Sequence, residues 1–274
     1  MIIAGESLSR KKMRIMDRMK IGIIGAGAMG GAVARGLAES GMTASDICVA
    51  NPSPGKLREF ADMGMRTTSD NAEAASCADI VVIAVKPWIL PAVAEELRAV
   101  IDPAHQQVAV IVAGVSGEEL LKMFGRQKGA CNLAIVMPNT AMTLRESMTF
   151  IVNVSGATPL ADSVFCRLGA VKDIEERLLP AATALASCGI AYALRYIRAA
   201  VEGGVELGFR ASDAQEIVTA TVRGAAALLS VDGAHPEVEI DRVTTAGGIT
   251  IRGLNAMEQA GFTPAVIAGL KAGR

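Results

Sequence analysis

Near the start of the chain, a short apolar segment runs directly into a glycine-rich turn, in the order Lys20-Ile21-Gly22-Ile23-Ile24-Gly25-Ala26-Gly27-Ala28-Met29-Gly30. Gly25 permits a tight turn, Gly27 lets the backbone approach a phosphate, and Gly30 allows close packing of helix on strand. The helical pattern that follows offers the free N–H groups of its first turn, at Ala28 and Met29, and the positive end of its dipole. The segment predicts a strand, turn and helix that bind a dinucleotide pyrophosphate, with an ordinary glycine-rich turn as the alternative.

Short apolar runs alternate with helical patterns through the first half of the chain. The runs are continuously apolar, which is typical of parallel strands covered on both faces. They span residues 21–24, 47–50, 80–85, 108–112, 134–136, 148–154 and 171–174. The helical patterns span residues 32–40, 54–63, 90–100, 117–124 and 159–168. This alternation predicts an α/β fold with a doubly wound sheet of the Rossmann type.

The pattern changes near residue 177, where long stretches rich in Ala, Leu, Val, Glu and Arg begin. They span residues 178–187, 191–207, 212–230, 250–260 and 264–272, without alternating β-branched residues. Small residues such as Ala225-Ala226-Ala227 suit close helix packing, including packing between subunits. We therefore predict an N-terminal extension over residues 1–19, a dinucleotide-binding domain over 20–176 and an all-α domain over 177–274.

Composition limits the partners, metal sites and cellular compartment that are expected for this protein. A net charge of −1 gives no indication of nucleic acid or an anionic membrane as a partner. The five cysteines are scattered and only two histidines occur, which argues against a metal site and favours reduced thiols in the cytoplasm. Residues 1–18 lack the apolar core of a signal peptide, and no apolar run reaches the roughly 18–20 residues of a membrane span.

The second predicted strand ends in Ala50-Asn51-Pro52-Ser53, without an acidic residue at its tip. NAD-specific Rossmann domains carry a carboxylate there that accepts hydrogen bonds from the ribose. A carboxylate would repel an adenosine 2′-phosphate, whereas Asn51 and Ser53 can donate to it. The tip therefore favours NADP, although no arginine accompanies it. A plain turn and helix cap is the alternative for each residue.

Two further strands end in polar segments at the edge where ligands of parallel sheets bind. Ala84-Val85-Lys86-Pro87 follows the strand at 80–85, and its lysine is a candidate catalytic acid, a candidate cofactor contact or a residue that matters only through its backbone. Met137-Pro138-Asn139-Thr140 follows the strand at 134–136, so its amide and hydroxyl are placed to touch nicotinamide or substrate. A strand-ending turn is the alternative for this second segment.

The second half contributes one polar loop, Asp241-Arg242-Val243-Thr244-Thr245-Ala246-Gly247-Gly248-Ile249-Thr250, which leads into a helix. Its glycines, hydroxyls and helix start form an anion cradle of N–H groups and a dipole. A small carboxylate fits such a cradle. An ordinary helix cap is the alternative.

These segments together resemble the pyrroline-5-carboxylate reductase family of proline synthesis. The likeness runs from Lys20 to Lys271 and rests on the glycine-rich turn, the segments at 84–87 and 137–140, and the run from Asp241 to Gly253-Leu254. Further matches are His235-Pro236, Ala191-Tyr192, the run Glu202-Gly203-Gly204-Val205-Glu206-Leu207-Gly208, and Glu258 with Gly261-Phe262.

The resemblance implies that an NAD(P)H-dependent oxidoreductase transfers a hydride to the C=N carbon of 1-pyrroline-5-carboxylate and forms L-proline. A cyclic iminium is already electrophilic, so the protein needs little beyond positioning and exclusion of water. That agrees with the lack of an obvious histidine or carboxylate dyad in the motifs. The expected cofactor is NADPH, with NADH as the alternative.

The resemblance also implies roles for particular residues. Gly247, Gly248 and Thr250 would bind the substrate carboxylate, with Thr245 assisting. Cofactor contacts would include Ser53 and Asn71 near the 2′-phosphate, and Lys86, Pro87 and Asn139 near the nicotinamide, with Asn139 also near the substrate. Lys86 and Thr250 are the candidate catalytic residues. Family members complete the site with helices of a partner subunit, which implies at least a homodimer and further assembly into decamers.

The chain departs from the family pattern in two places. The usual Ser-Gly-Ser-Gly-Pro-Ala-Tyr reads Ala186-Ser187-Cys188-Gly189-Ile190-Ala191-Tyr192, and in the loop a Ser-Pro pair is replaced by Thr245-Ala246 and a frequent Thr or Ala by Ile249. Losing a proline makes the loop less stiff. These changes bear on the ring size of the imine substrate.

Two other readings of the same architecture compete. An imine reductase or β-hydroxyacid dehydrogenase is one, but the latter needs a catalytic lysine on a helix of the second half. The helical stretch 191–207 offers Arg195 and Arg198 and no lysine. The other is a non-catalytic NADP-binding module, which has no need of a carboxylate cradle.

Overall fold

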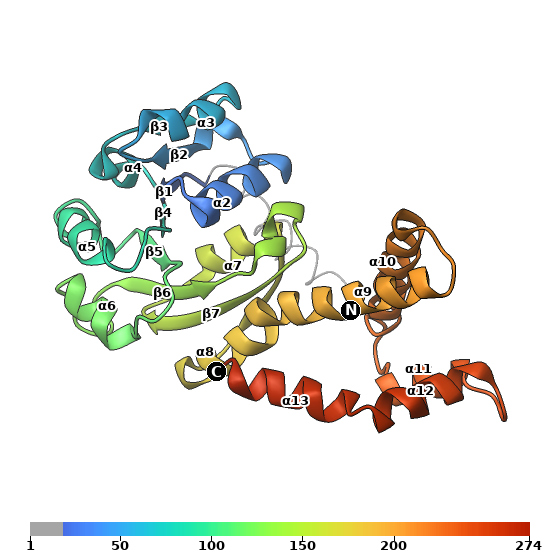
Figure 1. Cartoon of the computed structure of the whole chain (residues 1–274). Helices are drawn as coiled ribbons and strands as arrows, with labels where there is room; N and C mark the ends of the chain where they lie inside the picture. The colour runs from blue at the N-terminus through green and yellow to red at the C-terminus, as the bar shows by residue number, and fades with distance from the viewer. Residues whose placement is uncertain (1–18) are drawn as a thin grey trace, which may run out of the picture. The chain divides into compact units, whose positions relative to one another are not determined.

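A single eight-stranded sheet dominates the first unit of the computed structural model, which describes residues 19–274 (Figure 1). The strand order is β3-β2-β1-β4-β5-β6-β7-β8. The strands are β1 Ile21–Ile24, β2 Ile47–Ala50, β3 Arg66–Thr68, β4 Ile80–Ile83, β5 Gln107–Val110, β6 Asn132–Met137, β7 Ser147–Ser155 and β8 Gly169–Asp173. The predicted Rossmann-type α/β fold is confirmed. Of the predicted extension over 1–19, only Met19 lies within the described residues, and it is buried.

Helices cover both faces of this sheet. They are α2 Ala28–Glu39, α3 Arg58–Asp62, α4 Asn71–Ser76, α5 Leu90–Arg98, α6 Gly117–Met123, α7 Pro159–Phe165 and the short α8 Leu179–Ala182. Side chains alternate between the two faces along each strand. In β1, Ile21 and Ile23 pack in the cluster that includes Leu37 of α2, whereas Ile24 packs in the cluster that includes Leu90 of α5. Burial on both faces explains why the strands are continuously apolar.

The pairing of β6 with β7 is antiparallel, whereas all other neighbouring strands of this sheet are parallel. We expected parallel strands throughout. A parallel return needs a crossover of about a dozen residues or more, and only residues 138–146 join these two strands. Residues 156–168 include α7 and are long enough for the parallel return from β7 to β8.

Two short elements of the first unit were not predicted from the sequence. Strand β3 reads Arg-Thr-Thr at the sheet edge, where exposure removes the apolar signal. Helix α4 is six residues long, and the Asp70 carboxylate caps it by accepting from the N–H groups of Ala72 and Glu73. Neither element has enough residues to present a hydrophobic period.

Tertiary contacts divide the described chain between Ala182 and Thr183. The second unit begins with a π-helical turn, Thr183–Ser187, and continues with α9 Cys188–Glu206, α10 Ala211–Leu228, α11 Pro236–Val243, α12 Ile249–Gln259 and α13 Phe262–Ala272. Helix α11 was not predicted. The predicted domain limit at residue 176 stays a prediction, six residues before this division.

Small residues and aromatic edges hold the helices of the second unit together. The Tyr192 hydroxyl of α9 donates to the Gly269 carbonyl of α13 at 3.2 Å. The rings of Tyr196 and Phe262 meet edge to face, with centroids 6.4 Å apart. A Cβ on Gly204 would lie 3.0 Å from the Ala214 Cβ, so the glycine allows α9 and α10 to approach closely.

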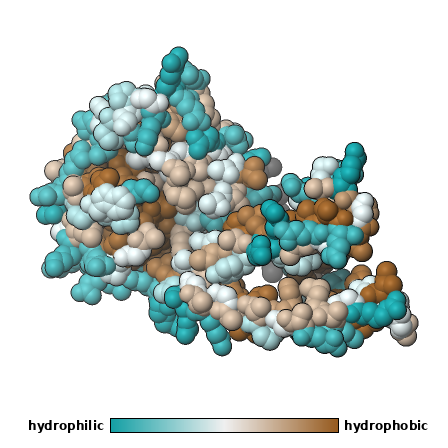
Figure 2. All heavy atoms as spheres, viewed as in Figure 1, coloured by the Kyte–Doolittle hydropathy of each residue, from teal (hydrophilic) through white to brown (hydrophobic). Residues whose placement is uncertain are grey.

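The second unit buries little apolar surface within one chain. None of the residues of α9, α11, α12 or α13 is buried, and apolar residues lie at the surface of these helices (Figure 2). By length and composition alone, the helical stretch Glu176–Glu206 could cross a membrane, which is weak evidence for a span. We expected no membrane span, because no apolar run of the sequence reaches the roughly 18–20 residues that one needs.

Candidate functional site

The three glycines of the predicted turn have three different surroundings at the carboxyl end of β1. Gly25 has a φ of +103°, a conformation that L side chains rarely adopt, and a Cβ there would lie 2.7 Å from the Ala84 carbonyl oxygen. A Cβ on Gly30 would collide with the carbonyl oxygen of Gly25. A Cβ on Gly27 would have no atom within 4 Å. Gly25 and Gly30 therefore hold the backbone turn, whereas Gly27 borders open space.

Helix α2 begins directly at this open space. Gly27 is its N-cap residue, no side chain caps the helix, and its first turn carries no acidic residue. The first N–H groups of a helix have no intrahelical acceptor, and its dipole makes this end positive. Ala28 is exposed and Met29 half-buried at this end. The arrangement fits the pyrophosphate of a dinucleotide.

The side chain of Asn51 fastens the tip of β2 to the glycine-rich turn. Its Oδ1 accepts from the Ala26 N–H at 3.2 Å, and its Nδ2 donates to the Ser53 carbonyl at 3.3 Å. Asn51 is 7% exposed. Its amide is thus engaged with the protein itself, and its predicted direct contact with a 2′-phosphate stays a prediction. Ser53 next to it is exposed, followed by the 3₁₀ turn Pro54–Lys56.

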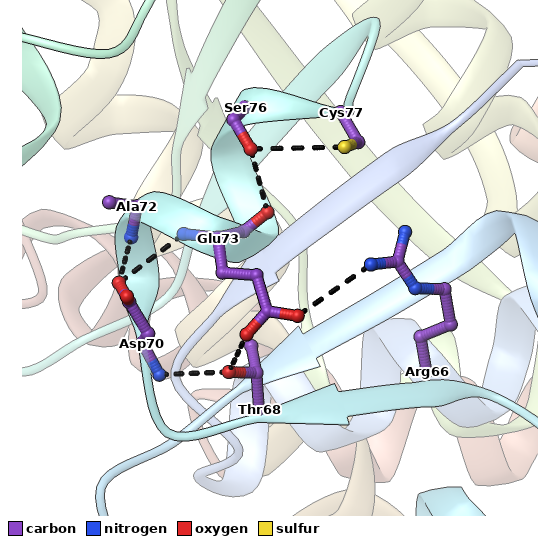
Figure 3. A network of polar contacts seen from close by, with 7 residues as sticks. All are labelled: Arg66, Thr68, Asp70, Ala72, Glu73, Ser76 and Cys77. Carbon is purple, nitrogen blue, oxygen red and sulfur yellow. Dashed lines mark hydrogen bonds and ion pairs between the residues drawn. The ribbon is translucent and has the colours of Figure 1, made fainter.

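Beside this tip, a polar network joins β3 to α4 (Figure 3). The Thr68 hydroxyl donates to the Glu73 carboxylate at 2.5 Å and accepts from the Asp70 N–H at 3.1 Å. The network fixes the start of α4, where Asn71 is half-buried and donates through its Nδ2 to the Glu96 carboxylate of α5 at 2.9 Å. Asn71 therefore lies in the edge region predicted for the cofactor, with its amide already bound to a neighbour.

The segment after β4 places its predicted residues at the same edge of the sheet. Ala84 is buried, Val85 half-buried, and Lys86 and Pro87 exposed. The Ala84 N–H donates to the Ile24 carbonyl at 2.9 Å, which joins this segment to the glycine-rich turn. The Lys86 ammonium lies 6.0 Å from the centroid of the Trp88 ring.

Asn139 is buried and lies two residues after the carboxyl end of β6. Its Oδ1 accepts from the Ala141 N–H at 3.0 Å and so begins the 3₁₀ turn Thr140–Leu144. Its own N–H donates to the Ser147 hydroxyl at 3.1 Å, and that hydroxyl lies 3.1 Å from the Thr149 hydroxyl. These bonds give Asn139 a structural role in its turn. Its predicted contact with nicotinamide or substrate stays a prediction.

The predicted anion cradle lies in the second unit, at the N-terminus of α12. Gly247 has a φ of +69° and Gly248 is the N-cap residue, with its N–H donating to the Thr245 carbonyl at 2.9 Å. No side chain caps this helix, and Ile249 and Thr250 of its first turn are exposed. Free N–H groups beside the Thr245 and Thr250 hydroxyls suit a carboxylate.

A separate cavity of about 240 Å³ lies at the amino ends of the first strands, away from the glycine-rich turn; it is lined by Lys20, Ile21, Ser45, Asp46, Cys48, Arg66, Ala74, Cys77 and Ala78. The Ser76 hydroxyl and the Arg66 guanidinium lower the pKa of the exposed Cys77 thiol, whereas burial raises the pKa of Cys48. The carboxyl edge of the sheet, and not this cavity, carries the predicted cofactor residues.

Comparisons with known proteins agree with this geometry. Residues 176–274 match the family model for pyrroline-5-carboxylate reductase dimerisation, and residues 20–115 match that for coenzyme F420-dependent NADP oxidoreductases. Pyrroline-5-carboxylate reductase 2 of Dictyostelium discoideum is 34% identical over 93% of this chain and 91% of its own length. The enzyme of Synechocystis is 34% identical over 93% of this chain and 95% of its own length.

The chain belongs to the pyrroline-5-carboxylate reductase family.

Solved structures of this family share the fold over nearly the whole chain. That of Coxiella burnetii has a TM-score of 0.87 at 29% identity and covers 93% of this chain and 96% of its own. That of Plasmodium falciparum, solved with NADP bound, has a TM-score of 0.81 at 25% identity and covers 94% of this chain and 96% of its own. The family predicted from the sequence motifs is confirmed.

Two features of this edge of the sheet were not predicted from the sequence. One is the pair of hydrogen bonds by which the Asn51 side chain binds Ala26 and Ser53. The other is Trp88, which lies two residues after Lys86 and contacts its ammonium. A lone tryptophan has no periodic or motif signal, and its exposure becomes apparent only in the folded chain.

Proposed function

We propose that this chain reduces 1-pyrroline-5-carboxylate to L-proline with NADPH, the last step of proline biosynthesis. The observation that carries the proposal is the 34% identity to named pyrroline-5-carboxylate reductases over more than 90% of both chains. When bound, NADPH would supply the hydride for the imine carbon of the protonated substrate, whose pyrroline nitrogen would keep the iminium proton as its amine N–H. The protein residues bind, orient and shield the reactants.

The cofactor is held, in this proposal, at the carboxyl edge of the first sheet strands. The open space at Gly27 and the N-terminus of α2 receive the pyrophosphate. Ser53 is exposed at the tip of β2 and donates to the 2′-phosphate, while Asn51 holds that tip in place. The tip of β2 itself carries no carboxylate that would repel the 2′-phosphate of NADPH.

The substrate carboxylate is bound at the start of α12. The N–H groups beside Gly247 and Gly248 and the hydroxyl of Thr250 donate to its two oxygens, with Thr245 assisting. Anion binding by backbone N–H groups needs no charged side chain. In this proposal Lys86 and Asn139, which lie at strand ends of the cofactor edge, orient the nicotinamide.

The helical unit forms a homodimer in this proposal, because residues 176–274 match a dimerisation domain and α9 buries none of its residues within one chain. We assign the apolar stretch Glu176–Glu206 to this subunit contact and not to a membrane span. Higher assembly into decamers and a cytoplasmic location are part of the same proposal. No nucleic acid is required.

The test is a direct assay of the purified protein with racemic 1-pyrroline-5-carboxylate and either NADPH or NADH. Loss of dihydronicotinamide absorbance and formation of proline should occur together, with a higher kcat/KM for NADPH. A folded sample that binds NADPH but yields no proline with either cofactor contradicts the proposal. Analytical ultracentrifugation of the same sample measures the oligomeric state.

A further inference from the structure

Trp88 is the sole tryptophan of the chain, and 75% of it is exposed. The four phenylalanines of residues 19–182, Phe60, Phe124, Phe150 and Phe165, are all buried in the core around the sheet. Trp88 is therefore the one exposed aromatic side chain in this part of the described chain. Tryptophan is highly buried on average in folded proteins, so this exposed indole is an unusual apolar surface that is available to a ligand.

The place of Trp88 is the point where a doubly wound sheet binds its ligand. β4 is the neighbour of β1 on the side opposite β2, so the chain reverses its direction of winding between these strands. Dinucleotides lie across this point, with one mononucleotide over each half of the sheet. The pyrophosphate site at α2 and the β2 tip take the adenosine half, which leaves the nicotinamide half for the ends of β4, β5 and β6.

A closed turn fixes Trp88 relative to this edge. The Ile89 N–H donates to the Lys86 carbonyl at 2.9 Å, so residues 86–89 form one hydrogen-bonded turn. The ring of Pro87 restricts the backbone inside it. Directly after the turn, Leu90 is fully buried and anchors α5. The Lys86 ammonium, 6.0 Å from the indole centroid, makes a cation–π contact that orients both side chains.

We propose that the indole of Trp88 forms an aromatic wall against the nicotinamide half of the bound cofactor, with the Lys86 ammonium held against the same ring. The inference rests on the proposed function and adds a cofactor-binding residue to it. A flat apolar ring at this position excludes water from one side of the nicotinamide and limits its rotation. Both effects favour hydride transfer, because the ring must present one face to the imine carbon.

The experiment compares Trp88→Ala and Trp88→Phe with the native protein. Binding of NADPH is followed by the emission of its own dihydronicotinamide, and binding of adenosine 2′,5′-bisphosphate, which lacks nicotinamide, by calorimetry. Trp88→Ala should raise the Kd for NADPH about tenfold, the loss expected for one stacking contact, and leave the Kd for the bisphosphate within about twofold. Trp88→Phe, which keeps an aromatic ring, should recover most of the NADPH affinity.

Three outcomes would overturn the inference. They are an unchanged Kd for NADPH in Trp88→Ala, an equal loss of affinity for NADPH and the bisphosphate, and dissociation of the oligomer with native NADPH affinity. The last would assign Trp88 to a subunit contact. Thermal melting checks that the variants fold, which the exposure of the side chain leads us to expect. A native protein that binds no NADPH would instead contradict the proposed function itself.

Discussion

Asn51 and Ala26 are joined by a hydrogen bond of 3.2 Å, in which the side-chain oxygen of Asn51 accepts from the backbone N–H of the glycine-rich turn. The bond links the tip of β2 to the end of β1 at the place where an NAD-specific domain carries a carboxylate. A single uncharged side chain thus joins the two strand ends and leaves the tip of β2 without a carboxylate.

Asn51→Asp should shift the cofactor preference from NADPH toward NADH. The aspartate keeps an acceptor for the Ala26 N–H, and its negative charge repels the 2′-phosphate while offering an acceptor to the ribose hydroxyls of NADH. The ratio of kcat/KM for NADPH to that for NADH should fall by at least about tenfold, or about 1.4 kcal/mol. Steady-state kinetics with both cofactors measure it.

The matched control is Asn51→Ala, which removes both side-chain hydrogen bonds without adding charge. It should destabilise the fold by about 1–3 kcal/mol because the buried Ala26 N–H loses its partner. Its cofactor ratio should move much less than that of the aspartate variant. Equal ratios in the two variants would mean that charge at this position does not set the preference.

Substitution of the three glycines of the turn should affect different properties: two of the variants should lose stability, and the third should lose affinity for the cofactor. Gly25→Ala and Gly30→Ala should each destabilise the protein by about 1–3 kcal/mol, the first through its positive φ and the second by overlap with the Gly25 carbonyl. Gly27→Ala meets no atom within 4 Å, so its stability should change by less than about 0.5 kcal/mol.

In the same series, Gly27→Ala should weaken NADPH binding about tenfold, because its methyl group occupies the space that the pyrophosphate needs. Chemical denaturation and NADPH titration of the three variants provide the two measurements. If Gly27→Ala binds NADPH as tightly as the native protein does, the pyrophosphate does not bind at this turn.

Much of the fold was predictable because strong local rules determine it. Apolar runs such as Ile80–Ile83 are buried on both faces, and a glycine with positive φ such as Gly25 leaves a direct trace in the sequence. The missed elements, β3 and α4, are short and polar, so they show no hydrophobic period. The antiparallel β7 follows from connection length, which an apolar run does not encode.

The candidate site was predictable in its location and less so in its contacts. Motifs place residues at the ends of strands, and the parallel sheet brings those ends to one edge. Which partner a side chain takes depends on distances between segments far apart in sequence, as Asn71 and Glu96 illustrate at 2.9 Å. The amide that a motif offers to a ligand can therefore be engaged by the protein.

Thr250→Ala should weaken substrate binding and leave cofactor binding nearly unchanged. Thr250 is exposed in the first turn of α12, and in the proposed function its hydroxyl donates to the substrate carboxylate. The KM for 1-pyrroline-5-carboxylate should rise about tenfold, or about 1.4 kcal/mol, with the KM for NADPH within about twofold. Thr250→Ser retains the hydroxyl and should behave as the native enzyme. Equal effects on the two KM values would mean that the substrate carboxylate does not bind at Thr250.

Cys77 should be alkylated faster than Cys48, the other thiol that lines the cavity at the amino edge of the sheet. Its pKa is lowered by the Ser76 hydroxyl and Arg66, so more thiolate is present at neutral pH, whereas burial raises the pKa of Cys48. Alkylation by iodoacetamide, followed by peptide mass spectrometry, should modify Cys77 before Cys48. Arg66→Met should slow the reaction at Cys77, and an unchanged rate would exclude the guanidinium as its cause.

The start of α6 should lose stability as the pH falls. The Glu119 carboxylate accepts from the N–H and hydroxyl of Ser116, both at 2.8 Å, and the Ser116 hydroxyl in turn accepts from the Glu119 N–H. These bonds lower the pKa of Glu119 in the folded state, so its stabilisation is present above the unfolded pKa, about 4.3 for a free glutamate, and is lost as the pH falls through the folded pKa.

Glu119→Gln tests this pH dependence. The glutamine can still accept a hydrogen bond but carries no charge to favour it, so its melting temperature should lie below that of the native protein at pH 7 and approach it as the medium becomes acidic. Ser116→Ala removes the cap itself and should lower Tm by about 2–4 °C at neutral pH. Parallel thermal melts of the three proteins across the acid range supply the data. A Tm difference between the glutamine variant and the native protein that is independent of pH would rule out ionisation of Glu119 as its source.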